Sequence, residues 1–236
     1  MKIVVINGTE QKGCTFEMKE MFLSSMGSGH NITEFYLPRD CPVFCTGCKR
    51  CFFADISVCP HSEYTVPIWD SILEADLLVL TSPTYVFHVT AQMKALLDHF
   101  ATKWMAHSPE KPMFYKQAVI ITNAIGKGME KTAKDIRDSL DFWGIARTYV
   151  IKQALFKVEW DLIADKEKAK IKAKCENVSA KIKAVKNVKP HIRIKFWFYI
   201  MRFAQKLINK KEPKPTKDYL YWKENGWLDG KKPWKD

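Results

Sequence analysis

The sequence predicts an α/β fold in which helices cover both faces of a parallel β-sheet. Short apolar or β-branched runs alternate with segments of helical periodicity over roughly the first 150 residues. The runs read as parallel strands buried on both faces. Loops that contain glycine or proline follow three of them, at Gly8, Pro83 and Gly126. In folds of this class, ligands bind at the carboxyl ends of the strands.

The expected strands and helices alternate along the chain. Residues 2–7 form a β-branched run that ends at Gly8, and the next helix shows apolar side chains at helical spacing, among them Met18 and Phe22. The clearest strand is 76–81, because Ser82 and Pro83 stop a continuous apolar run. The remaining strands are expected at 32–37, 117–122 and 146–151, and the remaining helices at 67–75, 89–100 and 129–143.

The composition changes near Asp165. From there to Asp236 the chain has 21 Lys and Arg against 8 Asp and Glu, whereas the preceding residues have 17 against 18. The net charge of +12 therefore belongs to the last third of the chain. We expect a domain at 1–164, with a cysteine-rich insertion at 38–65, followed by a basic helical extension at 165–236.

Two helices are expected in the extension. Residues 165–189 are rich in Lys and Ala and predict an exposed helix. Residues 191–209 predict a basic amphipathic helix that packs on its own domain or on a partner subunit, with contact to a membrane surface as the alternative. This helix does not span a membrane, because Arg202 interrupts it and about 20 apolar residues are required. Its polar stripe consists of His191, Lys195, Arg202, Lys206 and Asn209.

The end of the extension contains five large aromatic side chains between Tyr219 and Trp234, so this segment is expected to dock on the protein. The aromatic residues of the extension lie in apolar stripes, and we therefore expect no binding of nucleic acid. The expected partner is a second copy of the chain, in a dimer or a tetramer, and a redox protein is a further candidate.

The amino terminus and the cysteines indicate a compartment. Met1 leads directly into a strand-like run without the features of a secretory signal. Seven cysteines, an odd number and clustered, favour ligand or redox chemistry over disulfides in a reducing environment. We therefore expect a cytoplasmic protein.

Four of the cysteines lie within fifteen residues of the insertion. Cys45, Cys48 and Cys51 have the spacing Cys-x2-Cys-x2-Cys, and Cys59 follows with Pro60 behind it. This pattern resembles the cysteine run that holds a cubane cluster in bacterial ferredoxins. Structural zinc is a second interpretation, although it more often uses two separated Cys-x2-Cys pairs. A third is that the cysteines bind nothing, and Cys41 is a candidate replacement ligand.

The first strand-end loop, residues 7–15, suits a phosphate group. Gly8 and Gly13 have the spacing of a phosphate-binding P-loop, but Cys14 stands where that motif requires lysine, so triphosphate chemistry is not expected. The hydroxyl and backbone N–H groups that remain, at the start of a helix, fit a single phosphate monoester. An ordinary strand-to-helix turn is the alternative.

The loops at 82–90 and 122–129 complete one elongated pocket. The first contains Pro83, two aromatic residues and His88, which together could hold a flat conjugated ring. His88 alone is also consistent with a histidine at the start of a helix. Neither loop has the Gly-x-Gly-x-x-Gly spacing of a dinucleotide fold.

At these positions the chain resembles the flavodoxin-like NAD(P)H-dependent FMN reductases. Residues 8–15 resemble their Gly-Ser-Pro-Arg-x-x-x-x-Thr phosphate loop, with Glu10 and Gln11 in place of the proline and arginine. Residues 82–98 resemble their longer Ser-Pro-x-Tyr…Gln-x-Lys-x-x-x-Asp signature. The cysteine segment is similar to that of the iron-sulfur flavoproteins in this family. The resemblance covers about residues 1–155 and implies a doubly wound five-stranded sheet in the order 2-1-3-4-5.

The resemblance also implies FMN as the ligand. Its phosphate would be held by Thr9, Lys12, Cys14 and Thr15. Its isoalloxazine would lie against Pro83, Thr84, Tyr85, Val86, Phe87 and His88, with Thr122, Asn123, Ala124 and Gly126 on the far side. His88 is the only candidate for a direct role in catalysis, as a donor to the polar edge of the flavin, and the metal ligands would be Cys45, Cys48, Cys51 and Cys59.

Three functions follow as hypotheses. The first is an enzyme that passes electrons between NAD(P)H or a redox protein, FMN and a [4Fe-4S] cluster. The second is a cluster-free NAD(P)H-dependent reductase of flavin, quinone or nitro compounds. The third is a flavin-binding or zinc-binding interaction module without catalysis. In the first, the cysteine insertion is expected at the same carboxyl edge of the sheet as the flavin pocket.

Overall fold

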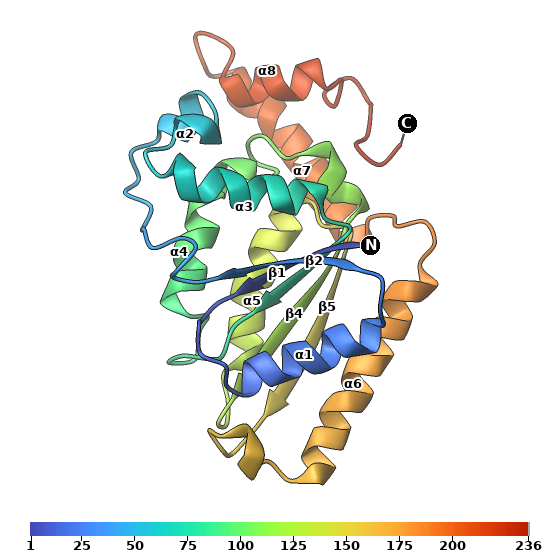
Figure 1. Ribbon diagram of the computed structural model, residues 1–236. Helices are drawn as coiled ribbons and strands as arrows, with labels where there is room; N and C mark the ends of the chain where they lie inside the picture. Colours follow the sequence, from blue (N-terminus) through green and yellow to red (C-terminus); the bar gives the residue numbers. More distant parts are fainter. Residues whose placement is uncertain (236) are drawn as a thin grey trace.

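The computed structural model, which describes residues 1–235, contains a five-stranded parallel sheet in the order β2-β1-β3-β4-β5 (Figure 1). This order confirms the predicted fold class. The predicted strand positions agree with the observed ones to within a few residues. The strands are β1 (Lys2–Asn7), β2 (Asn31–Tyr36), β3 (Leu77–Thr81), β4 (Gln117–Ala124) and β5 (Arg147–Ala154).

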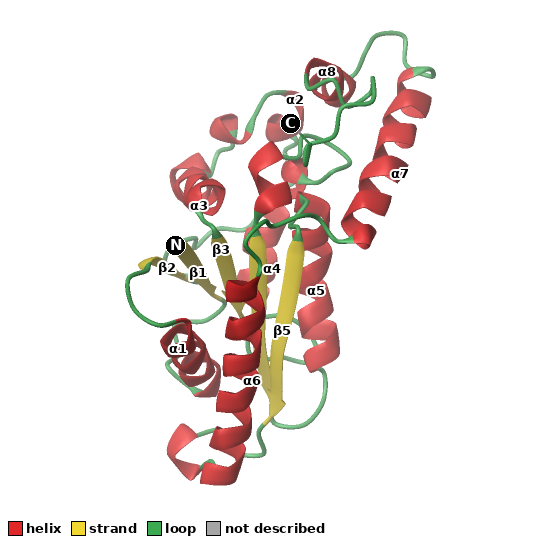
Figure 2. Cartoon of the chain, turned by 90° about the vertical axis from the view of Figure 1, so that its right-hand side faces the viewer, coloured by secondary structure: helices red, strands yellow, loops and turns green. Residues whose placement is uncertain are grey.

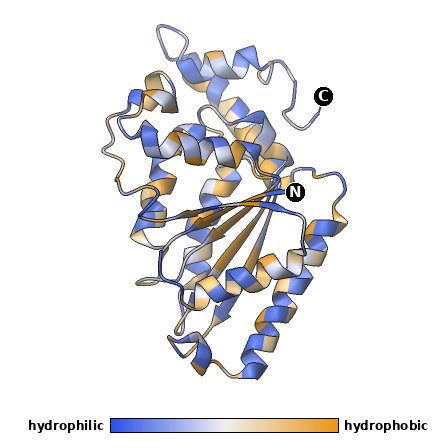
Figure 3. Cartoon of the chain, viewed as in Figure 1, coloured by the Kyte–Doolittle hydropathy of each residue, from blue (hydrophilic) through white to orange (hydrophobic). Residues whose placement is uncertain are grey.

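The three central strands are apolar because both of their faces are covered. Every residue of β3 is buried, as are almost all residues of β1 and β4. Figure 3 shows the sheet as the most hydrophobic part of the chain. The edge strand β2 is more exposed and accordingly contains Asn31, Thr33 and Glu34. Strands β1, β3 and β4 end side by side, since Asn7 pairs with Thr81 and Thr81 pairs with Ile121.

Helices pack on each face of the sheet. In Figure 1, α3 (Ser62–Glu74) lies above β1 and α1 (Cys14–Met26) lies below it. The upper layer also contains α4 (Ala91–His99) and α5 (Met129–Trp143), whose apolar residues share one core with α3 and the sheet. The lower layer combines α1 with α6 (Asp165–Ala184) in a second core.

Helix α6 differs from the prediction. It was expected to be an exposed part of the extension, but it covers the sheet beside α1 (Figure 2). Its lysines lie on the solvent side, while Ile171, Cys175, Val178 and Ile182 are buried. These four residues recur at helical spacing. The lysines of the helix outnumber them, so the composition suggested an exposed helix. We therefore describe α6 together with the α/β body and use the term extension for the residues after Ala184.

The extension folds back onto one end of the body. It contains α7 (Ile192–Asn209) and α8 (Lys217–Glu224), which pack together above α3 and α5 (Figure 1). Its aromatic side chains form a third core with residues of the body. The segment from Tyr219 to Trp234 therefore docks, because Trp222, Trp227 and Leu228 are buried there.

The remaining helical turns are short. They are α2 (Arg50–Phe53) and the 3₁₀ turns η1 (Ile56–Val58), η2 (Ala101–Lys103), η3 (Lys111–Tyr115) and η4 (Trp160–Leu162). Within residues 1–235, no helix combines the length and the apolar character needed to cross a membrane.

Candidate functional site

A cavity of about 290 Å³ opens at the carboxyl ends of β1, β3 and β4. The strand-end loops that the sequence singled out form its walls. Eight of the predicted flavin-site residues line it: Thr9, Cys14, Thr15, Pro83, Thr84, Tyr85, Asn123 and Ala124. The loop after β1, the loop after β3 and the end of β4 therefore meet at one site, as the fold class predicts.

Gly8 allows the first loop to pass close to the neighbouring strand. Its N–H donates to Thr81 O at 2.7 Å, and its carbonyl accepts from Thr90 Oγ1 at 2.7 Å. A Cβ atom at this position would lie 2.7 Å from Thr81 O and 2.9 Å from Thr90 Oγ1. The contact therefore requires glycine, and it joins the loop to both β3 and the start of α4.

The amino terminus of α1 faces the cavity without a side-chain cap. Gly13 is the N-cap residue and offers no side-chain acceptor to the first N–H groups of the helix. Gly13, Cys14 and Thr15 line the cavity, and the Thr15 hydroxyl donates to Asn123 Oδ1, which joins α1 to the end of β4. Unpaired N–H groups at the positive end of a helix dipole provide a place for a phosphate group.

Cys14 lies in the cavity as a protonated thiol. Its Sγ donates to Val158 O over 3.5 Å, and the side chain is buried. Burial raises the pKa of the Cys14 thiol above its ordinary value, and Glu17 adds to that effect against an opposing backbone hydrogen bond. The thiol therefore packs in the wall of the cavity.

The loop after β3 turns sharply at the rim of the cavity. Tyr85 and His88 exchange two backbone hydrogen bonds of 3.0 Å, so Val86 and Phe87 occupy the two central positions of a tight turn. Both have positive φ, 49° and 67°, which is rare for bulky side chains. Gly128 makes room for this turn, because a Cβ there would lie 2.9 Å from the Cα of Phe87.

His88 points away from the cavity. Its Nδ1 lies 3.0 Å from Asp135 Oδ2 on α5, and the same carboxylate accepts from the N–H of Val89 at 3.2 Å. His88 is not among the residues that line the cavity. In this conformation its role is to hold the loop to α5, and no contact in the structure places it at the flavin edge.

Five other predicted residues also lie outside the cavity lining. Thr122 is buried beneath it, with its hydroxyl 3.4 Å from that of Thr84. Lys12 is exposed, with its Nζ 5.5 Å from the centre of the Phe16 ring. Val86, Phe87 and Gly126 belong to the rim loops but do not contact the cavity.

Part of the cavity wall was not predicted from the sequence. Lys157 and Val158, in the loop after β5, reach over Cys14, and Ile125 lies just beyond the end of β4. Gln11 and Gly13 complete the lining. The loop after β5 also lies at the carboxyl edge of the sheet, so the rule that identified the other loops could have found it. Lys157 is the lysine that lines the cavity, whereas the predicted Lys12 does not.

The four candidate metal ligands lie close to one another on the segment after β2. Cys45 and Cys48 are exposed, whereas Cys51 and Cys59 are half-buried. Burial raises the pKa of Cys51, and the nearby thiols of Cys59, Cys45 and Cys48 raise it further. The backbone turns tightly between the first three cysteines, since Gly47 and Lys49 both have positive φ.

Cys59 and the nearby His61 take part in a chain of hydrogen bonds. The His61 N–H donates to Cys59 Sγ at 3.5 Å, and the His61 ring lies 2.9 Å from His99 Nε2. Because His99 Nδ1–H donates to Ala95 O at 2.8 Å, His99 Nε2 accepts from the His61 ring. Within residues 1–235, however, no three Cys, His, Asp or Glu side chains are arranged to hold a metal ion.

Cys41 is not available as a replacement ligand in this structure. Its side chain is buried in the core shared by α3, α4 and the sheet. Burial raises the pKa of its thiol, with a further contribution from Cys59 against an opposing backbone hydrogen bond to Val43.

The extension supports the cysteine segment. Lys217 Nζ donates to Cys51 O at 3.4 Å, and the ring of Phe52 packs edge-on against His107. His107 in turn donates to Asp218 Oδ2 at 2.7 Å. Figures 1 and 2 show α2 beside α8, at the opposite end of the molecule from the carboxyl ends of β4 and β5. The segment follows β2 along the chain, and none of its cysteines lines the cavity.

Comparison with solved structures agrees with this fold. An FMN-dependent NADH-azoreductase from Bacillus anthracis, solved in complex with FMN, superposes with a TM-score of 0.56. The two chains are 13% identical, and the alignment covers 77% of this chain and 99% of the azoreductase. At this level of identity the match shows the shared fold.

Two curated relatives are iron-sulfur flavoproteins of Archaeoglobus fulgidus. One is 28% identical over 147 residues, which cover 61% of this chain and 64% of the relative. The other is 29% identical over 99 residues, which cover 42% and 48%. The chain thus matches less than two thirds of the length of either relative. The profile of one family, NADPH-dependent FMN reductase, matches residues 1–160, and because this match spans more than half of the chain, the protein belongs to that family.

Proposed function

We propose that the protein is an FMN-dependent oxidoreductase that transfers electrons between a reduced nicotinamide or a redox protein, FMN and a [4Fe-4S] cluster. The observation that supports this most directly is the cavity at the carboxyl ends of β1, β3 and β4, with the uncapped start of α1 in its wall. The family assignment and the names of the two iron-sulfur flavoprotein relatives point in the same direction.

The residues of the cavity fit FMN. The N–H groups at the start of α1 would hold its phosphate together with the hydroxyls of Thr9 and Thr15, and Lys157 would offset part of its charge. Pro83 to Tyr85 and Asn123 to Ile125 would enclose the ring system. When bound, FMN accepts a hydride and can release electrons one at a time. The part of the protein is to orient the ring and to restrict the access of water.

Four thiols within one short segment provide the donor set of an iron-sulfur cluster. Cys45, Cys48 and Cys51 lie on one tight loop, and the N–H of His61 already donates to the sulfur of Cys59. Hydrogen bonds to sulfur are among the features that set the potential of such clusters. We propose Cys45, Cys48, Cys51 and Cys59 as the ligands.

A cluster-free reductase is the second candidate. It is favoured by the exposure of Cys45 and Cys48, and by the lack of an assembled metal-binding group among residues 1–235. In that case both electrons would pass from FMN directly to a small acceptor, and the cysteine segment would have a structural role only.

The visible spectrum of protein purified without air distinguishes the two candidates. The cluster is supported by flavin bands together with a broad shoulder at about 400 nm, and by equal amounts of iron and sulfide. Flavin bands alone would support the cluster-free reductase and contradict the cluster. A colourless protein that contains zinc would overturn both and indicate a zinc-binding module.

Substitution of one exposed cysteine tests the ligand assignment. Cys48→Ser is expected to lose the iron and sulfide while the flavin bands and the stability of the fold remain, because Cys48 is exposed and lies outside the cavity. Thr46→Ala, in the same exposed loop, is the matched control and should retain both cofactors. Equal iron content in the two variants would show that Cys48 is not a ligand.

We further propose that a second copy of the chain covers the rim of the flavin cavity. Four large apolar side chains are exposed there, which is unusual for a rim that faces water: Tyr85, Val86, Phe87 and Ile125. Light scattering during size exclusion should give a dimer or tetramer. Val86→Asp, at the most exposed of the four, should reduce the mass to that of a monomer, and an unchanged mass would contradict the proposal.

A further inference from the structure

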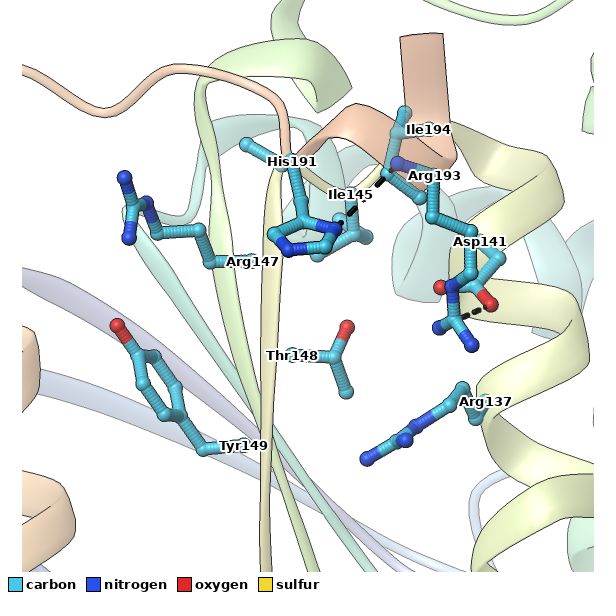
Figure 4. A pocket seen from close by; sticks show the side chains of 10 residues that line it. Arg137, Asp141, Ile145, Arg147, Thr148, Tyr149, His191, Arg193 and Ile194 are labelled. Atoms are coloured by element: carbon cyan, nitrogen blue, oxygen red, sulfur yellow. Dashed lines mark hydrogen bonds and ion pairs between the residues drawn. The ribbon is translucent and has the colours of Figure 1, made fainter. Parts of the chain in front are cut away.

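A second cavity, of about 340 Å³, lies at the amino end of β5 (Figure 4). It is formed between α5, the start of β5 and the start of α7, so the body and the extension both contribute to it. Its lining contains three arginines and a histidine: Arg137, Arg147, Arg193 and His191. The other lining residues are Asp141, Ile145, Ala146, Thr148, Tyr149 and Ile194.

The cavity has an excess of positive charge. Asp141 is its only carboxylate, and Arg193 pairs with it at 2.5 Å. Arg137 is half-buried, and among residues 1–235 no side chain pairs with it at hydrogen-bond distance. Burial lowers the pKa of the Arg137 guanidinium and repulsion from Arg193 lowers it further, whereas the attraction of Asp141 and Asp138 opposes both effects. Figure 4 shows Arg137 reaching from α5 towards β5.

Two further donors lack partners. The Thr148 hydroxyl is shielded from solvent and forms no hydrogen bond. His191 caps α7, and its Nδ1 accepts from the Arg193 N–H at 3.4 Å. Because Nδ1 accepts this hydrogen bond, a ring proton lies on Nε2, which can donate to a ligand. Arg137, Thr148 and His191 thus offer three kinds of donor around one cavity, and the lack of a partner is costly for the buried Thr148 hydroxyl.

We propose that this cavity binds a small molecule through a phosphate group. A guanidinium fork matches the geometry of phosphate oxygens, and the partly buried position strengthens the interaction. The site is separate from the flavin cavity, because the eight residues of β5 lie between the two and span about 25 Å. A ligand held by Arg137 of the body and by His191 of the extension would also stabilise the docking of the extension.

Calorimetric titration of the full-length, flavin-loaded protein with inorganic phosphate and with pyrophosphate tests the proposal. The wild-type protein is expected to bind pyrophosphate at one site per chain, and Arg137→Gln should weaken this binding about tenfold or more. Lys181→Gln removes the same charge from an exposed position of α6 and should have no effect. The flavin spectrum reports that each variant is folded.

Two results would overturn the proposal. One is the absence of saturable binding of either anion to the wild-type protein. The other is an equal loss of affinity in Arg137→Gln and Lys181→Gln, which would mean that the anions respond to overall charge alone.

The exposed side of α7 supports a second, independent inference. Six apolar side chains form one continuous strip along the helix, which we call the apolar stripe: Ile192, Phe196, Tyr199, Ile200, Phe203 and Leu207. Each is between 40% and 71% exposed. The opposite side of α7 is already used, since Ile194, Phe198 and Gln205 are buried against the body and α8. Packing on its own domain therefore accounts for one face of this helix only.

The segment that carries the apolar stripe is positively charged. Between Asn177 and Lys211 the chain has ten Lys and Arg and no Asp or Glu. Lys195 and Lys206 flank the stripe on α7 itself, whereas Arg193 is paired with Asp141 of α5. A second copy placed on the stripe would bring two such cationic helices together, which is unfavourable. A surface with negative charge and an apolar interior complements both features.

We infer that α7 lies on the surface of a membrane that contains anionic lipids. A helix with a Lys- and Arg-rich polar face and aromatic residues on the other face is typical of interfacial helices, and each cation near an anionic leaflet strengthens binding. At 18 residues, α7 would lie along the surface over about 27 Å. The apolar stripe would enter the boundary between headgroups and acyl chains.

Flotation of the full-length protein with vesicles tests this inference. Binding is expected to vesicles of phosphatidylcholine with phosphatidylserine, and to weaken with salt and without phosphatidylserine. Phe196→Ser with Phe203→Ser should reduce binding about tenfold or more, whereas Leu220→Ser, an exposed apolar residue of α8, should not. Absence of binding would refute the inference, and so would a change of the double variant from dimer to monomer, which would assign the apolar stripe to a second copy.

Discussion

At the scale of single residues, Gly8 connects the predicted phosphate loop to the sheet. Gly8→Ala is expected to lower the free energy of unfolding by about 1–3 kcal/mol, because its Cβ would overlap Thr81 O and the Thr90 hydroxyl. Chemical denaturation measures the change. Gly126→Ala is the control, since a Cβ at that position would meet nothing within 4 Å, and it should stay within about 0.5 kcal/mol of the wild type. Equal effects would contradict the proposed close contact.

Lys116 is expected to make the free energy of unfolding depend on pH in the alkaline range. Its Nζ donates to Leu73 O at 2.8 Å and to Ala75 O, and burial lowers its pKa from 10.5 to about 8 against the attraction of Asp76. Between pH 8 and 10.5 the unfolded chain binds more protons at this residue than the folded chain does. The contribution of Lys116 to the free energy of unfolding therefore rises with pH in this window and is constant below it.

Denaturation of the wild type and of Lys116→Met at about pH 7.5 and about pH 10 tests this expectation. Groups that the two proteins share cancel in the comparison, so the wild type should gain stability relative to the variant as the pH rises. Lys172→Met, at an exposed position of α6, should follow the wild type. A constant difference between the wild type and Lys116→Met would contradict the assigned pKa.

At the scale of elements, α6 is part of the body although its composition resembles that of the extension. Ile171→Ala is expected to lower the free energy of unfolding by about 2–4 kcal/mol, because Ile171 is fully buried in the core with α1 and the sheet. Ile192→Ala, at an exposed position of α7, should cost less than about 0.5 kcal/mol. A small effect of Ile171→Ala on the free energy of unfolding would contradict the packing of α6 against the sheet.

At the scale of the whole molecule, the extension and the body share a core, so they should unfold together. Trp222 is fully buried, stacks on Phe198, and donates from Nε1 to His107 O at 2.9 Å. Trp222→Ala is expected to lower the free energy of unfolding by about 3–5 kcal/mol in a single transition. Because His107 and Lys217 support the cysteine segment, the same variant should also incorporate less iron.

The control for this prediction is Leu220→Ala, which changes an exposed residue of the same helix and should leave both stability and iron content unchanged. Thermal unfolding of Trp222→Ala in two separate steps, with the body intact after the first, would show that the extension is an independent unit. Truncation after residue 189 provides a second measurement, since it exposes Phe114 and Met105 and should lower the stability of the body.

The sequence alone determined the α/β fold class, the alternation of strands and helices, and the loops that form most of the cavity at the carboxyl ends of the strands. These features follow from local patterns, because apolar runs of strand length, helical periodicity and the turn residues Gly8 and Pro83 act on neighbours in the chain. Parallel strands then bring their carboxyl ends together, and so Thr15 and Asn123 meet across the cavity.

Tertiary packing decided the rest. It placed α6 on the sheet, turned His88 towards Asp135, extended Lys157 over the cavity and set the cysteine segment against α8. Each of these outcomes depends on contacts between residues far apart in the sequence. Neither composition nor periodicity identifies such contacts. The second cavity illustrates the same point, because Arg137 and His191 meet only when the extension folds back onto the body.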